Sequence, residues 1–248
     1  MRILLLLPLL GLAGASSVER YKRVTGGAEC RSTEALHHVV LTDSRNNPLC
    51  GGALLSPIWV LTAAHCDERG LKVYIGIRAG DDINTKVQPV KIQRKVKHRN
   101  FAKNNRRFIN DIMLIELRHE VSNPNIISLP TDCGNYRNVP KVPKNTDLLA
   151  SGWETLQAGS KRKHPKLHCV KMQWVECPEL DPPLSRDAFC AGEGNRKTRC
   201  GDSGGSLVYN NIVYGVVRSE CGPDDDDPSI FTSVCSHLDW IKEKTKLP

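Results

Sequence analysis

The sequence predicts an all-β protein of antiparallel barrels or sandwiches, with one helix at the C-terminus. Short runs rich in β-branched and other apolar residues recur along the chain. Clusters of Gly, Pro, Asn and Asp separate them, as expected for strands joined by turns. Regularly spaced short strands are typical of antiparallel architectures. The clearest runs are residues 58–63, 71–77, 90–96, 112–117, 148–153, 171–176 and 212–217.

The end of the chain has a different pattern. Residues 236–245, SHLDWIKEKT, place Leu238 and Ile241 on one helical face and lysines near the last turn. An apolar stripe and basic residues near the C-terminal end favour a helix, which we expect over 236–246. The Pro- and Asn-rich stretch 121–135 is the best candidate for a linker between two halves.

Composition favours a folded, secreted protein. The chain has 248 residues, 40% of them hydrophobic and 25% charged, and a net charge of +8. Residues 1–15 combine a basic start, a short apolar run and small residues, which predicts a signal peptide; a buried N-terminal helix is the alternative. No later run reaches the roughly 18 apolar residues of a membrane span. Ten cysteines then predict disulfides, because secretion exposes them to an oxidising compartment.

Three short motifs carry the candidate chemistry. LTAAHC ends in His65 and Cys66, NDIMLIEL contains Asp111 before an apolar run, and CGDSGGS contains Ser203. Nucleophilic serine catalysis needs a hydroxyl, an imidazole that takes its proton, and a buried carboxylate that orients the imidazole.

These motifs, in this order, resemble the trypsin/chymotrypsin-like serine proteases, from about Val24 to Pro248. The resemblance implies two antiparallel six-stranded β-barrels, about 24–122 and 136–235, followed by the helix. It implies that Ser203 is the nucleophile, His65 the general base and acid, and Asp111 the residue that orients His65. The backbone N–H groups of Gly201 and Ser203 are then the oxyanion hole.

The resemblance extends to activation and cross-linking. YKRVTGGAE (21–29) resembles a zymogen activation site, with residues 16–23 as propeptide, cleavage after Arg23, and the new Val24 amine pairing with Asp202. A surface basic site before an ordinary strand is the alternative. The implied disulfides are Cys30–Cys169, Cys50–Cys66, Cys133–Cys235, Cys177–Cys190 and Cys200–Cys221.

The specificity pocket departs from the family. Thr198, beside Arg199, stands where a trypsin has the aspartate that attracts Lys or Arg. Arg218 stands at a serine that commonly supports the catalytic aspartate, and only Ser219 and Glu220 separate it from Cys221. Ser229 replaces a glycine of the pocket wall. The acidic run 224–227 is either a solvated loop or a source of a pocket carboxylate, and the sequence leaves both open.

Residues 91–108 hold eight Lys or Arg and no acid. Together with residues 161–164 they suggest a site for anionic glycans, or simply a solvated basic face. These basic residues do not lie within any known nucleic-acid-binding motif.

We therefore expect a secreted serine endopeptidase, made as a zymogen, whose specificity is not that of trypsin. The alternative is a catalytically impaired homologue that acts as a binding or regulatory protein. Expected partners are a protein or peptide substrate and an activating protease. We expect a monomer with no cofactor, no metal site and no contact with membrane or nucleic acid.

Overall fold

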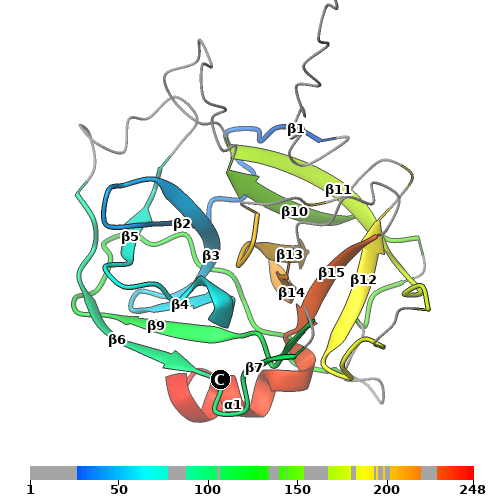
Figure 1. Cartoon of the computed structure of the whole chain (residues 1–248). Helices are drawn as coiled ribbons and strands as arrows, with labels where there is room; N and C mark the ends of the chain where they lie inside the picture. The colour runs from blue at the N-terminus through cyan, green and yellow to red at the C-terminus, as the bar shows by residue number, and fades with distance from the viewer. Residues whose placement is uncertain are drawn as a thin grey trace, which may run out of the picture.

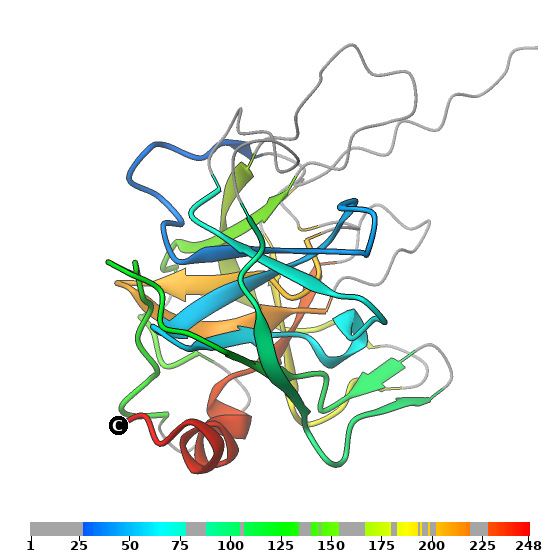
Figure 2. The same cartoon turned by 90° about the vertical axis from the view of Figure 1, so that its left-hand side faces the viewer.

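In a computed structural model of the chain, two antiparallel sheets lie side by side, with a helix at one end (Figure 1). A quarter turn shows the same helix at the lower edge, near the C-terminus (Figure 2). The structure describes residues 27–77, 88–104, 107–133, 140–143, 145–153, 167–179, 183–192, 194, 198, 202–218 and 228–248. The expected signal peptide, the propeptide and the cleavage site after Arg23 lie outside these residues.

The first sheet has six strands in the order β5-β2-β3-β4-β9-β6 and curls around an apolar core. A single bridge between Val73 and Val90 joins its two edges. Val, Leu and Ile occupy alternate or successive positions in its strands, and these residues pack well on the pleated, buried face of a sheet. The bounds are β2 His38–Thr42, β3 Pro48–Ser56, β4 Trp59–Thr62, β5 Lys72–Ile75, β6 Ile92–Lys97 and β9 Met113–Leu117.

The second sheet has the order β1-β11-β10-β13-β14-β15-β12, and a further pairing of β11 with β12 closes six of its strands into a barrel. Closure leaves those six strands without a free edge. Phe189 and Phe231 stack at 5.5 Å within its core. The bounds are β1 Ala28–Glu29, β10 Leu148–Trp153, β11 Leu167–Val175, β12 Ala188–Gly192, β13 Ser206–Tyr209, β14 Ile212–Val217 and β15 Ser229–Ser233.

Three smaller features complete the described chain. A 3₁₀ turn, η1 Ala64–Cys66, follows β4, and a separate hairpin pairs β7 Ala102–Asn104 with β8 Arg107–Ile109. A second 3₁₀ turn, η2 Cys235–His237, leads into α1 Leu238–Thr245, which buries Ile241 against the first core. The helix ends at Lys246, in the left-handed conformation at φ 60°.

The predicted fold class is confirmed: an all-β protein of two six-stranded antiparallel units with a short C-terminal helix. All seven runs singled out in the sequence coincide with strands. The candidate linker contacts both sheets, since Ile127 N–H donates to Leu54 in β3 and Val213 N–H in β14 donates to Ser128. The two sheets are thereby held together along the connecting chain.

Candidate active site

His65 lies on the short turn η1, directly after β4. Its neighbours Ala64 and Cys66 are buried, whereas 19% of the His65 side chain is exposed. The disulfide between Cys66 and Cys50 ties this turn to β3. The turn therefore presents the imidazole outward from a fixed backbone.

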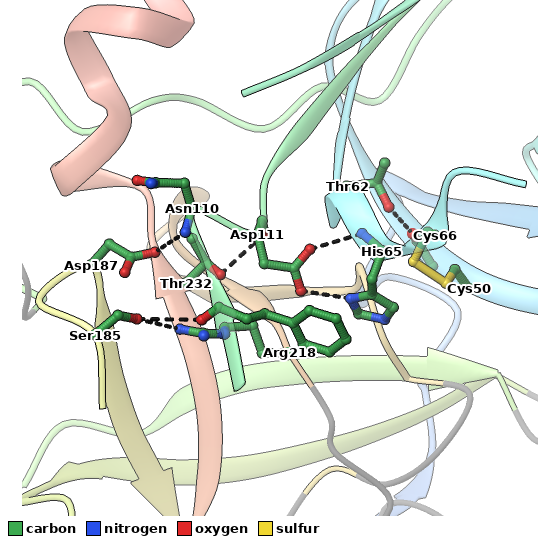
Figure 3. Close-up of polar contacts among 12 residues, drawn as sticks. Cys50, Thr62, His65, Cys66, Asn110, Asp111, Ser185, Asp187, Arg218 and Thr232 are labelled. Carbon is green, nitrogen blue, oxygen red and sulfur yellow. Dashed lines mark hydrogen bonds and ion pairs between the residues drawn. A yellow bond between two sulfur atoms is a disulfide. The ribbon is translucent and has the colours of Figure 1, made fainter. Parts of the chain in front are cut away.

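Asp111 holds His65 by two hydrogen bonds, one to its backbone and one to its imidazole (Figure 3). The His65 backbone N–H donates to Oδ1 at 2.8 Å, and Nδ1 lies 2.6 Å from Oδ2. Because a carboxylate only accepts, the proton belongs on Nδ1, which leaves Nε2 as an acceptor. The Asp111 side chain is fully buried, so this pairing is shielded from water. An imidazole held in this tautomer can take a proton at Nε2.

Ser203 sits in a tight turn at the junction of the two sheets. Its carbonyl accepts from Gly51 N–H at 2.7 Å, and the following Gly204 donates to Val217 in β14 at 2.9 Å. Gly204 has φ +77°, and a Cβ there would lie 2.5 Å from the Gly51 carbonyl, so only glycine fits. Gly51 follows Cys50, whose disulfide leads to the His65 turn. The fold thus brings the Ser203 turn against the strand that is cross-linked to the turn carrying His65.

Asp202 is fully buried beside the same turn. Its carboxylate lies over Gly152, where an added Cβ would fall 1.7 Å from Oδ1. The second barrel therefore encloses this acid just before Ser203.

One residue of the site was missed by sequence reasoning. The Phe108 ring stacks on the His65 imidazole, with centroids 4.8 Å apart and planes 14° from parallel. Phe108 lies in β8, and the Lys103 ammonium stands 5.3 Å from the centre of its ring. Its place three residues before Asp111 was the available signal, but no local pattern says which way its ring points.

Arg218 directly follows β14 and has only 1% of its surface exposed. Its Nη1 donates to Ser185 Oγ at 3.1 Å, so the guanidinium turns toward Ser185 (Figure 3). Among the described residues, both carboxylate hydrogen bonds of Asp111 come from His65. Arg218 therefore stands at the expected place in the chain without donating to that carboxylate.

Part of the expected specificity pocket is described. Thr198 N–H donates to Ser229 Oγ at 2.7 Å, and both residues are buried, so these two positions face one another. The other expected pocket, oxyanion and activation positions lie outside the described residues: Arg199, Ser219, Glu220, Gly201, Arg23 and Val24.

The described residues contain four disulfides, and they are four of the five that the resemblance implies: Cys30–Cys169, Cys50–Cys66, Cys133–Cys235 and Cys177–Cys190. Cys200 and Cys221 lie outside the described residues. Cys50, His65 and Cys66 cluster closely enough to suggest metal ligands, but the two sulfurs are bonded to each other. None of the helices among the described residues is long and apolar enough to cross a membrane.

Comparison with known proteins identifies the family. The model of the trypsin family matches residues 24–241. The chain is 34% identical to the thrombin-like enzyme elegaxobin-1 of Protobothrops elegans, over 88% of this chain and 94% of that protein. It is 31% identical to trypsin-4 of Rattus norvegicus over 98% of both chains. It is 32% identical to snake venom serine protease homolog 2A of Craspedocephalus gramineus, over 88% of this chain and 86% of that protein. The chain belongs to the trypsin family of serine proteases.

Proposed function

We propose that this protein is a secreted serine endopeptidase, made as a zymogen, that cleaves peptide bonds through an acyl-enzyme. The observation that carries the proposal is the buried Asp111 carboxylate holding His65 Nδ1 at 2.6 Å, with the Ser203 turn packed against the neighbouring strand. Family membership supports the same chemistry.

In the proposed reaction Ser203 Oγ attacks the substrate carbonyl while His65 Nε2 takes the hydroxyl proton. Asp111 keeps Nδ1 protonated and stabilises the imidazolium that forms. The amides of Gly201 and Ser203 stabilise the oxyanion. His65 then gives the proton to the leaving amine, and water releases the acyl group.

Covalent labelling tests this proposal. The chain is expressed, cleaved after Arg23, checked for Val24 as its new N-terminus, and treated with a fluorophosphonate probe. We expect labelling of the wild type and none of Ser203→Ala. Correctly processed wild type that stays unlabelled would count against a working catalytic site.

We propose that the preferred residue before the cut is neither Lys nor Arg. Thr198, at the base of the expected pocket, is buried against Ser229 and brings no carboxylate. A lysine or arginine side chain of the substrate that enters a buried pocket needs a carboxylate of opposite charge to pair with it. A library of peptides varied at this position is expected to disfavour both basic residues, and selection of Arg would contradict the proposal.

Activation by cleavage and secretion are proposed together. The amine of Val24 is proposed to pair with Asp202, whose buried position beside Gly152 suits a switch that orders the Ser203 turn. Uncleaved protein is therefore expected to label far more slowly than cleaved protein.

Four disulfides fit an oxidising, extracellular location. Detection of the chain in the medium of expressing cells, starting near Ser16, tests the signal peptide.

A second candidate function is binding without catalysis. The buried Arg218, where the family has a small serine, favours it. One relative is itself named a serine protease homolog. Absence of labelling in correctly processed protein, together with a stable native fold, would favour this function.

We also propose weak binding of anionic glycans by the basic segment 91–108. Lys95 and Lys97 pair directly with Asp67, whereas Arg99 is only electrostatically attracted to Glu243 and the Lys103 ammonium lies over the Phe108 ring. Elution from a heparin column is expected to need more salt for wild type than for the double variant Arg99→Ala/Lys103→Ala. Equal elution of the two proteins would contradict the proposal.

A further inference from the structure

We propose that Asp187, Ser185 and Arg218 form a clamp from the second barrel that positions the His65–Asp111 pair, an inference that rests on the proposed protease function. The three residues are called the 185–218 clamp below. They are positioning residues: they act on the segment that carries Asp111 and on the ring that covers His65.

The first contact is at the residue before Asp111. Asn110 N–H donates to Asp187 Oδ2 at 2.9 Å, and Asp187 has only 9% of its surface exposed. Hydrogen bonds to a charged acceptor in a shielded place are among the stronger ones. Asn110 has φ +50°, a left-handed conformation that asparagine tolerates but that still needs support. Asp187 therefore fixes the backbone from which the Asp111 side chain projects.

The second contact is at Phe108. Ser185 Oγ donates to the Phe108 carbonyl at 3.4 Å, a long bond, and accepts from Arg218 Nη1 at 3.1 Å. The buried guanidinium thus holds the hydroxyl that faces β8. Asp187 and Ser185 together hold both ends of residues 108–110, from a distant part of the chain (Figure 3).

The clamped segment reaches His65 from two sides. Asp111 holds one edge of the imidazole through Nδ1, and the Phe108 ring covers one face at 4.8 Å. A shift of residues 108–110 therefore moves both the carboxylate and the aromatic face relative to His65. These supporting contacts affect the reaction rate, because a small misplacement of a catalytic base slows the reaction considerably.

The clamp also accounts for Arg218. A serine at this position commonly supports the catalytic aspartate directly. Here the longer side chain donates to Ser185, and the support passes through β8 instead. Ser185 provides the partner for the longer arginine side chain, and the same hydroxyl contacts the Phe108 carbonyl in another segment of the chain.

The test uses the full chain cleaved after Arg23, with Asp187→Ala, the conservative Asp187→Asn, and Phe108→Leu. Asp147→Ala is the matched control, because Asp147 is 45% exposed and pairs only with Lys171 at 3.5 Å. Three quantities are measured: the rate of fluorophosphonate labelling, the melting temperature, and the downfield proton resonance of His65 Nδ1–H in protein labelled with ¹⁵N-histidine.

We expect Asp187→Ala to slow labelling by roughly ten-fold or more, because a hydrogen bond to a charged group is lost. Its His65 Nδ1–H resonance is expected to shift or broaden. The Asp187→Asn variant keeps an acceptor oxygen and is expected to stay within about two-fold of wild type. Phe108→Leu is expected to disturb the resonance with little change in melting.

Two results overturn the clamp. One is an Asp187→Ala variant with wild-type labelling and an unchanged resonance. The other is an equal loss of rate and melting temperature in Asp187→Ala and Asp187→Asn, which indicates a structural role alone. If the wild type is not labelled at all, the proposed function fails by itself. The His65 resonance then decides on the clamp: a change in Asp187→Ala that is absent from Asp187→Asn and Asp147→Ala supports it, and no change in Asp187→Ala overturns it.

Discussion

Two adjacent buried histidines lie where the two barrels meet, behind the Ser203 turn. His37 Nε2 lies 2.8 Å from Ser206 Oγ, and His38 Nδ1 lies 3.0 Å from Ser151 Oγ. Burial lowers the pKa of His37 from 6.5 to about 4. Burial, and then the neighbouring His37, lower the pKa of His38 to about 3. Both rings are therefore neutral in the native protein at pH 5.

Acidification should destabilise the protein through these two rings. In the unfolded chain each histidine takes up a proton near pH 6.5, whereas in the native state each stays neutral to about pH 4. The unfolded state binds more protons in this window, so the free energy of unfolding falls as the pH falls from about 6.5 toward 4. Each ring contributes a loss of about 2 kcal/mol between pH 7.5 and pH 5, and the pair about 4 kcal/mol.

Urea denaturation followed by tryptophan fluorescence, with disulfides intact, measures this effect. Wild type is compared with the double variant His37→Gln/His38→Gln at pH 7.5 and pH 5. Other titrating groups contribute to both proteins and cancel in the comparison. Wild type is expected to lose about 4 kcal/mol more than the variant. A difference below about 1 kcal/mol would refute the assignment of two buried neutral histidines.

Three further predictions concern the site and the core. Asp111→Asn is expected to lower the labelling rate by about 10⁴-fold without unfolding, because it removes the acceptor that keeps His65 in its productive tautomer; stopped-flow labelling measures this. In Gly152→Ala the new methyl would lie 1.7 Å from the Asp202 carboxylate, so labelling is expected to be lost and thermal melting to fall by an amount equivalent to about 1–3 kcal/mol. Ile241→Ala, at a fully buried position of α1, is expected to cost about 2–5 kcal/mol in urea denaturation, and a cost below about 1 kcal/mol would show that the helix is not docked on the first core.

Much of the fold was predictable because its signals are local. Apolar strand-length runs and turn residues identify strands one at a time, and all seven runs are strands in the structure. The motifs around His65, Asp111 and Ser203 identify the family through residues that lie next to one another in the chain. The signal peptide, the activation site and the role of Gly201 remain predictions.

The contacts around the imidazole were not predictable from local signals. The stacking of Phe108 on His65, the direction of the Arg218 side chain and the bond from Asn110 to Asp187 join segments far apart, the last pair being 77 residues distant. Such contacts arise only when distant segments pack together, whether within the first unit or between the two barrels, and side-chain direction depends on the space that packing leaves.

The all-β class, the family and the candidate residues His65, Asp111 and Ser203 can all be inferred from the linear sequence. Each of these follows from periodicity or from a contiguous motif. The folded chain was needed to show that Arg218 turns to Ser185, that Phe108 covers His65, and that His37 and His38 are buried. Burial and side-chain direction depend on how distant strands and turns pack against one another, and no single stretch of chain contains that packing.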